Sequence, residues 1–300
     1  FWYESSKMMQ QLIRNQNKKK EEQIKDLQGF IQRFSANKSK SKQATSRKKI
    51  LDSIELDDMP ASSRKYPFVG FTAERELGKD ILFVENISKT VDGVKVLDDV
   101  TFSVGKNEKI AFVGDNEAGQ TALFQILVGE TEPDEGSFKW GVSTTRSYFP
   151  KDNAAFFEGC DMNLVEWLRQ YSSDTTETYL RGFLGRMLFS GDDVYKAVKV
   201  LSGGEKVRCM LSRMMLGTAN VLLLDQPTNH LDLESITAVN NGLSDFSGDV
   251  FFSSHDHQFI DTVATRIIEL GTAAEGGGVI DRTGSYDEFL EYKQSLKVQC

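Results

Sequence analysis

The sequence has no run of about 18 apolar residues, and it therefore predicts no membrane-spanning helix. Its first residues lack the charged segment and apolar core of a secretory signal peptide. The only cysteines are Cys160, Cys209 and Cys300, and their spacing fits no metal site. Reduced thiols in a cytoplasmic protein are the expectation that follows. The remaining composition, 39% hydrophobic and 27% charged, is typical of a globular chain with a sizeable core.

Charge is unevenly distributed along this chain, whose formal net charge is −8. Residues 1–65 contain 15 Lys or Arg and 8 Asp or Glu, whereas the remainder contains 21 and 36. The excess is sharpest in residues 7–49, which hold 13 basic and 3 acidic residues. An acidic body with a basic segment is typical of a protein in which that segment contacts a polyanion.

The basic segment also has the pattern of helices. Residues 4–34 repeat apolar side chains at three- and four-residue spacing, and a second helical run is expected from 47 to 54. A polar, basic tract separates these runs, and MPASSRKYP (59–67) has the composition of a linker. The segment predicts a helical hairpin or coiled-coil arm. Two roles remain open for it: a solvated spacer, or a contact arm for a polyanion or a protein, which its charge favours.

From Ile81 onward, short apolar strands alternate with helices, which predicts an α/β sheet with a more helical insertion. ILFVENI and VLDDVTFSV are expected to be antiparallel strands, and EKIAFV, VLLLD, VFFSSH and RIIEL strands of the core. Residues 284–297 predict a turn and a closing helix.

The segment GDNEAGQT (114–121) lies between the strand EKIAFV and the expected helix TALFQIL. It matches the phosphate-loop spacing G-x-x-x-x-G-K-[ST], except that Gln120 stands at the Lys position. In such a loop, backbone N–H groups and a helix N-terminus surround phosphate oxygens. Gly114 and Gly119 permit the turns, and Thr121 offers a hydroxyl to Mg²⁺. Taken alone, an ordinary strand-turn-helix corner is the better explanation of this match.

Three later segments favour a phosphate site. LSGGEK places Ser202 as the N-cap of the next helix, which again directs N–H groups toward an anion. About 20 residues on, VLLLDQPTNHLD is an apolar strand ending at Asp225, a carboxylate suited to orient Mg²⁺. Gln226 follows, where a general base would align water. An isolated histidine is most often structural, but His255, at the end of the strand VFFSS, can instead reach a terminal phosphate.

In this order, the four segments resemble the Walker A loop, signature, Walker B strand with D-loop, and H-switch of ATP-binding cassette (ABC) ATPases. The resemblance covers about residues 80–285. It implies a P-loop NTPase fold with a RecA-like core, an antiparallel β subdomain and an α-helical subdomain. It also implies ATP and Mg²⁺ as ligands, ATP hydrolysis as the activity, and a sandwich dimer.

The resemblance assigns a role to each matching residue. The catalytic positions would be Gln226 and His255, and the metal would be held by Thr121 and Asp225. Residues placed to contact the nucleotide are Gly114, Asp115, Asn116, Glu117, Ala118, Gly119, Gln120, Thr121 and Lys151. The signature residues, which would serve a partner domain's nucleotide, are Leu201, Ser202, Gly203, Gly204 and Glu205; Asp232 belongs to the D-loop.

Four positions depart from the family pattern. Gln120 replaces the Walker A Lys, Gln226 the Walker B Glu, Lys151 the Q-loop Gln, and Val91 an aromatic ring that stacks on adenine. Gln226 keeps the shape of Glu but cannot accept a proton, so slow or absent hydrolysis is expected. We hypothesise that Lys151 holds a phosphate oxygen and partly offsets the charge missing at Gln120.

The sequence PTNHLD and the charged segment with helical pattern ahead of the domain resemble those of the ABC-F group. Its members carry two ATPase domains joined by such an arm, and many bind the ribosome, with the arm reaching tRNA and the peptidyl-transfer region. The resemblance implies rRNA or tRNA and a second ATPase domain, in the same longer chain or a second copy, as partners, with no membrane partner. The rival functions are the ATPase subunit of a transporter, a non-hydrolysing scaffold gated by nucleotide, and an ATPase acting on DNA.

The expected organisation follows from this resemblance. Because FWYESS resembles FLEYKQ near the other end, and the chain does not begin with Met, residues 1–6 are expected to be the remnant of a preceding ATPase domain. Residues 7–66 would form the basic arm, 67–285 the ABC ATPase domain, and 286–300 a C-terminal helix.

Overall fold

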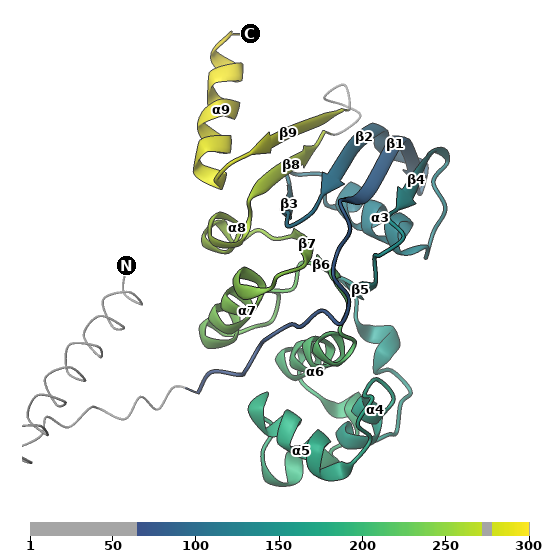
Figure 1. The fold of residues 1–300 in the computed structure, drawn as a ribbon, viewed down its shortest axis with the longest axis vertical. Coiled ribbons are helices and arrows are strands. Elements are labelled where there is room, and N and C mark those ends of the chain that lie inside the picture. Colours follow the sequence, from purple (N-terminus) through teal and green to yellow (C-terminus); the bar gives the residue numbers. More distant parts are fainter. Residues whose placement is uncertain (1–64, 272–277, 300) are drawn as a thin grey trace, which may run out of the picture. The chain divides into compact units, whose positions relative to one another are not determined.

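The computed structural model describes residues 65–271 and 278–299. The expected remnant and the expected arm as far as residue 64 lie outside the described residues. Two sheets and a set of helices make up the described part (Figure 1). None of its helices has the length and apolar character needed to cross a bilayer.

The larger sheet has six strands in the order β5-β6-β7-β3-β8-β9. The first five are mutually parallel, and β9 runs antiparallel to β8. Every residue of β6 and of β7 is buried, as expected for parallel strands covered on both faces. The strands are β3 (Lys109–Val113), β5 (Arg146–Phe149), β6 (Val221–Asp225), β7 (Asp249–Ser253), β8 (Arg266–Leu270) and β9 (Val279–Thr283).

Alternation along these strands divides the core into two layers. In β3, Ile110 and Phe112 point into one apolar cluster, while Ala111 and Val113 point into the other. The first cluster includes the apolar face of α3 (Glu117–Val128) and the smaller sheet. The second includes the buried faces of the helices on the opposite side. Figure 1 shows this arrangement, with α3 on one side of the sheet and α7 and α8 on the other.

The smaller sheet is antiparallel, with the order β2-β1-β4. Its strands are β1 (Asp80–Val91), β2 (Val94–Gly105) and β4 (Glu135–Trp140). A two-residue turn joins β1 to β2, and both Asp92 (φ 50°) and Gly93 (φ 80°) have the positive φ that such a hairpin turn requires.

Helices make up the rest of the described part. They are α4 (Leu164–Arg169), α5 (Glu177–Arg186), α6 (Gly203–Leu216), α7 (Leu233–Asp245), α8 (His257–Val263) and α9 (Tyr286–Gln299). Three short 3-10 helices occur at Ala154–Phe156, Gly191–Tyr195 and Val198–Val200. The group α4 to α6 lies together beyond the β5 edge of the sheet (Figure 1). The predicted α/β fold, with an antiparallel and a helical subdomain, is thereby confirmed.

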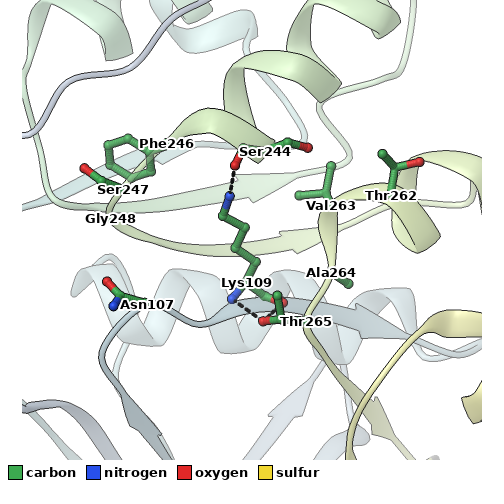
Figure 2. Close-up of a pocket in the computed structure, with 10 residues that line it drawn as sticks. All are labelled: Asn107, Lys109, Ser244, Phe246, Ser247, Gly248, Thr262, Val263, Ala264 and Thr265. Atoms are coloured by element: carbon green, nitrogen blue, oxygen red, sulfur yellow. Dashed lines mark hydrogen bonds between the residues drawn. The ribbon is translucent and has the colours of Figure 1, made fainter.

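A surface pocket of about 580 Å³ lies at the amino ends of β3, β7 and β8. Figure 2 shows Lys109 at its centre, with the ammonium donating a hydrogen bond to the carbonyl oxygen of Ser244. Burial lowers the pKa of this lysine. All the residues expected to contact nucleotide phosphates follow the opposite, carboxyl ends of the strands. The pocket is therefore not part of the predicted nucleotide site.

Asp249, next to this pocket, is the first residue of β7 and is fully buried. One of its carboxylate oxygens accepts a hydrogen bond from the backbone N–H of Glu108 at 2.8 Å. Burial nevertheless raises the pKa of the carboxyl group to about 7. The charge at this position is therefore unfavourable in the folded protein at neutral pH.

Gly242 allows close packing between α7 and the segment that precedes the smaller sheet. A Cβ at this position would lie 2.7 Å from the carbonyl oxygen of Val69 and 2.8 Å from its Cγ1. Both separations are shorter than van der Waals contact, so a larger residue would push the two segments apart.

We predict that Gly242→Ala lowers the free energy of unfolding by about 1–3 kcal/mol, because it overpacks this contact. Gly182→Ala, inside α5, is the matched control, since no heavy atom lies within 4 Å of a Cβ built there. The control should raise stability by about 0.5–1 kcal/mol through helix propensity. Urea unfolding of both variants measures the difference, and a gain for Gly242→Ala equal to that of the control would contradict the close contact.

We predict that Asp249 makes stability fall as pH rises. The folded protein retains a proton on Asp249 that the unfolded chain releases at an ordinary carboxyl pKa of about 4. The stability attributable to this group is therefore lost between about pH 4 and its folded pKa of about 7, and changes little above it. Asp249→Asn removes the titration, so its stability relative to the parent should increase across this window. Urea unfolding at unit pH steps measures this; the exposed Asp192→Asn is the control, and an identical profile for Asp249→Asn would contradict the prediction.

Candidate functional site

Strand order brings four chain segments to one edge of the larger sheet. The carboxyl ends of parallel strands lie at the same edge, which is where open α/β sheets bind ligands. Because β5, β6, β7 and β3 are consecutive neighbours, the segments that follow them are neighbours too. These segments contain Lys151 after β5, Gln226 after β6, His255 after β7 and the GDNEAGQT loop after β3.

The GDNEAGQT loop makes a tight turn between β3 and α3. Gly114 has φ 101°, which favours glycine. The Asn116 side chain caps α3 by accepting a hydrogen bond from the Gly119 N–H at 2.9 Å, and it donates to the carbonyl oxygen of Val96 at 2.7 Å. A Cβ at Gly119 would lie 2.6 Å from that carbonyl oxygen. The chain therefore closes tightly around the start of α3, where unpaired N–H groups and the helix dipole favour an anion.

Gln120 is turned into this loop. Its side chain is 3% exposed, and its amide nitrogen donates a hydrogen bond to the carbonyl oxygen of Gly114 at 3.1 Å. The amide thus connects the two ends of the loop but brings no positive charge. Asp115 and Ala118, the other two loop positions, are exposed.

Thr121 and Asp225 form a paired oxygen site beside the loop. The Thr121 hydroxyl donates to one Asp225 carboxylate oxygen at 2.6 Å, and the Ser253 hydroxyl donates to the other at 2.8 Å. Burial raises the pKa of Asp225, and these two hydrogen bonds oppose that rise. A hydroxyl and one carboxylate are the few hard oxygen ligands with which proteins hold Mg²⁺ together with substrate phosphates. The residues present therefore fit the expected ion.

Gln226 is held in a fixed position by both its backbone and its side chain. Its φ of 52° is in the left-handed region, which is uncommon for a residue other than glycine. The backbone N–H donates to the Ser253 hydroxyl at 3.0 Å, and the side-chain oxygen accepts from the Asn229 amide at 2.8 Å. The side-chain nitrogen is therefore the end that faces the phosphate loop.

Glu117, the first residue of α3, is the point where the other segments meet. One carboxylate oxygen accepts hydrogen bonds from the Lys151 ammonium at 2.6 Å and the Gln226 amide nitrogen at 3.2 Å. The other lies 3.0 Å from Nε2 of His255. The hydrogen bonds from Lys151, and secondarily from Gln226, lower the pKa of Glu117, so the group is a carboxylate at neutral pH.

The LSGGEK residues begin α6 in the helical subdomain. Ser202 is the N-cap, and it forms a capping box with Glu205, as the sequence predicted for the cap. Leu201 is buried. Glycine is needed at position 204, because a Cβ there would lie 2.9 Å from the carbonyl oxygen of His230. At Gly203, the nearest neighbour is likewise His230, so this segment contacts the stretch after β6.

Asp232 and Val91 also have defined positions. The Asp232 carboxylate caps α7 by accepting a hydrogen bond from the Ser235 N–H at 2.8 Å. Val91, at the end of β1, is 39% exposed. The roles given to both residues by resemblance stay predictions.

Sequence reasoning missed three contributors to the site. Ser253 holds both Asp225 and the backbone of Gln226, and Asn229 orients the Gln226 amide. Glu117 was expected only as a loop position, not as the partner of three other segments. The available signal was the presence of carboxylates, Asp115 and Glu117, in a glycine-containing loop.

Comparisons with protein families agree with this geometry. A family model described as "ABC transporter" matches residues 97–229, and a second model of the same description matches residues 1–69. The first match spans the phosphate loop, the signature and the Walker B strand.

Curated relatives extend the likeness over most of the chain. YkpA of Bacillus subtilis, described as an uncharacterized ABC transporter ATP-binding protein, is 63% identical over 97% of this chain and 53% of its own length. The energy-dependent translational throttle protein EttA of Escherichia coli is 31% identical over 90% of this chain and 48% of its own length. ABC transporter F family member 5 of Arabidopsis thaliana is 30% identical over 93% and 40%. The chain thus spans about half the length of these relatives.

A solved structure supports the fold. The complex of archaeal ribosomal stalk protein aP1 with the ribosome recycling factor aABCE1 matches 80% of this chain and 47% of that chain, with a TM-score of 0.59 and 23% identity. Because the motifs, their arrangement on the sheet and the family models all agree, the chain contains the ATPase domain of the ABC family.

Proposed function

We propose that this chain is the second ATPase half, with the preceding arm, of a cytoplasmic ABC-F protein that binds the ribosome under the control of ATP. The observation that carries the proposal is that a strongly basic segment, residues 7–49, precedes an ATP-binding cassette domain in the same chain. Resemblance to EttA and to an F family member supports the same group.

The arrangement at the sheet edge supports ATP binding with weakened hydrolysis. Thr121 and Asp225 fit a magnesium ion that would neutralise phosphate charge. The amide of Gln226 occupies the position from which a general base would align water, but it cannot take a proton. ATP would therefore stay bound in this domain for longer than in a site that hydrolyses it at a normal rate.

The charge of residues 7–49 supports nucleic acid as the partner of the arm. This segment contains 13 basic and 3 acidic residues, so it offers many ammonium and guanidinium groups to phosphates. The remainder of the chain is acidic. The LSGGEK residues would close over ATP held by a second ATPase domain. Closure of the two domains would then fix the orientation of the arm.

A second candidate, the ATPase subunit of a transporter, is favoured by the similarity to YkpA, which is described as an ABC transporter ATP-binding protein. That function needs a membrane-embedded partner that docks on the ATPase domain. The two candidates therefore differ in whether the arm meets ribosomal RNA.

We predict that the full-length two-domain protein cosediments with ribosomes, and more so with a non-hydrolysable ATP analogue than without nucleotide. Replacing Lys18, Lys19 and Lys20 with Glu should reduce the slope of log K against log salt by about 2, because phosphate contacts are lost. Replacing the exposed Lys79, Lys106 and Lys139 with Glu changes the net charge equally and is the matched control. Equal loss in both variants, or no ribosome binding by the parent protein, would contradict the proposal.

A further inference from the structure

Three segments that the family resemblance places around the terminal phosphate of ATP contact one carboxylate, that of Glu117. Lys151, Gln226 and His255 come from the ends of three different strands, and each lies within 3.2 Å of a Glu117 oxygen. The contacts are not local in sequence: Glu117 is 34 residues from Lys151 and 109 from Gln226. The carboxylate is therefore placed by the fold at the point on which these segments converge.

Two of the three groups, Lys151 and Gln226, donate hydrogen bonds to Glu117. Lys151 has only donors, and Gln226 is oriented by Asn229 so that its amide nitrogen faces the carboxylate. The His255 nitrogen lies 3.0 Å from Glu117 and 3.1 Å from the Gln226 nitrogen. The Gln226 amide nitrogen has a second N–H that Nε2 of His255 can accept, so His255 donates to Glu117 only in a form protonated at Nε2. Like a terminal phosphoryl group, this carboxylate is an anion that accepts charge-assisted hydrogen bonds from such donors.

We propose that Glu117 is an internal competitor of the terminal phosphate of ATP, and so sets the relative affinity of the site for ATP and ADP. This inference rests on the proposed nucleotide site. The terminal phosphate of ATP seeks the same donors that Glu117 holds, and its negative charge repels the carboxylate. Binding of ATP therefore requires that the contacts of Glu117 with Lys151, Gln226 and His255 break. ADP lacks the γ-phosphate, which is the terminal phosphate of ATP, and therefore leaves most of these contacts in place.

The position of Glu117 also has a purely structural explanation. An acidic residue in the first turn of a helix interacts favourably with the helix dipole, and Glu117 is the first residue of α3. That role would affect the stability of the protein, but it would not distinguish ATP from ADP. The ratio of the two affinities is therefore the measurement that separates the two explanations.

The test is the binding of ATP and of ADP, each with Mg²⁺, to the 300-residue chain and its Glu117→Gln variant by titration calorimetry. Gln keeps the length of the side chain and removes its charge. We expect ATP to bind the variant about fivefold more tightly, since the site is partly exposed to solvent and the repulsion is screened. The ADP affinity should change less than about twofold. Glu85→Gln, an exposed carboxylate on β1, is the matched control and should change neither affinity.

Each outcome bears on the proposal. An ATP to ADP preference equal in the parent and in Glu117→Gln overturns the role of Glu117 and leaves ATP binding intact. Weaker ATP binding by the variant also overturns it, because the carboxylate would then assist the nucleotide. Absence of ATP binding in every variant overturns the proposed function together with this inference.

Discussion

Parallel pairing of β5, β6, β7 and β3 is the constraint on which the candidate site depends. It aligns four strand ends at one edge, so that residues more than 100 positions apart in the chain become hydrogen-bonding partners. The pairing is stabilised by apolar side chains on both faces, which alternate between the α3 layer and the layer of α6 to α8. Burial of this sheet, rather than any single polar contact, thus fixes the geometry of the site.

Charges at this edge are arranged differently from the pattern that the family resemblance implies. The phosphate-loop position expected to carry a Lys is Gln120, whereas a cation stands at Lys151 on the neighbouring segment. The Walker B position expected to carry a Glu is Gln226, whereas a carboxylate stands at Glu117 in the loop. A cation and a carboxylate are therefore both present, but on other elements, and they form an ion pair with each other.

Much of the fold was predictable because its signals are local. The apolar runs VLLLD and VFFSS are long enough to mark buried strands, and Ser202 three residues ahead of Glu205 marks a capped helix. Composition and spacing likewise separated the small antiparallel sheet and the helical insertion from the core. These elements follow from residue patterns that do not depend on distant neighbours.

The interior of the site was less predictable, because its contacts depend on strand order. Nothing near Glu117 in sequence indicates that it meets Lys151, Gln226 and His255. The positive φ of Gln226 and its attachment to Ser253 are equally invisible in the sequence, since they arise only when β6 and β7 pair. The role of Lys151 as a phosphate contact was hypothesised from its position, and its ion pair with Glu117 was not.

The central claim is that this domain has the architecture of an ATPase but lacks a general base, because Gln226 stands at the position of that base. Phosphate release by the full-length protein and its Gln226→Glu variant, measured under single-turnover conditions, tests that view most directly. Gln294→Glu, an exposed position on α9, is the control. We predict hydrolysis at least about tenfold faster in Gln226→Glu, because a positioned general base contributes roughly 10²–10⁴-fold. Equal rates in the parent and in Gln226→Glu, with ATP bound to both, would contradict it.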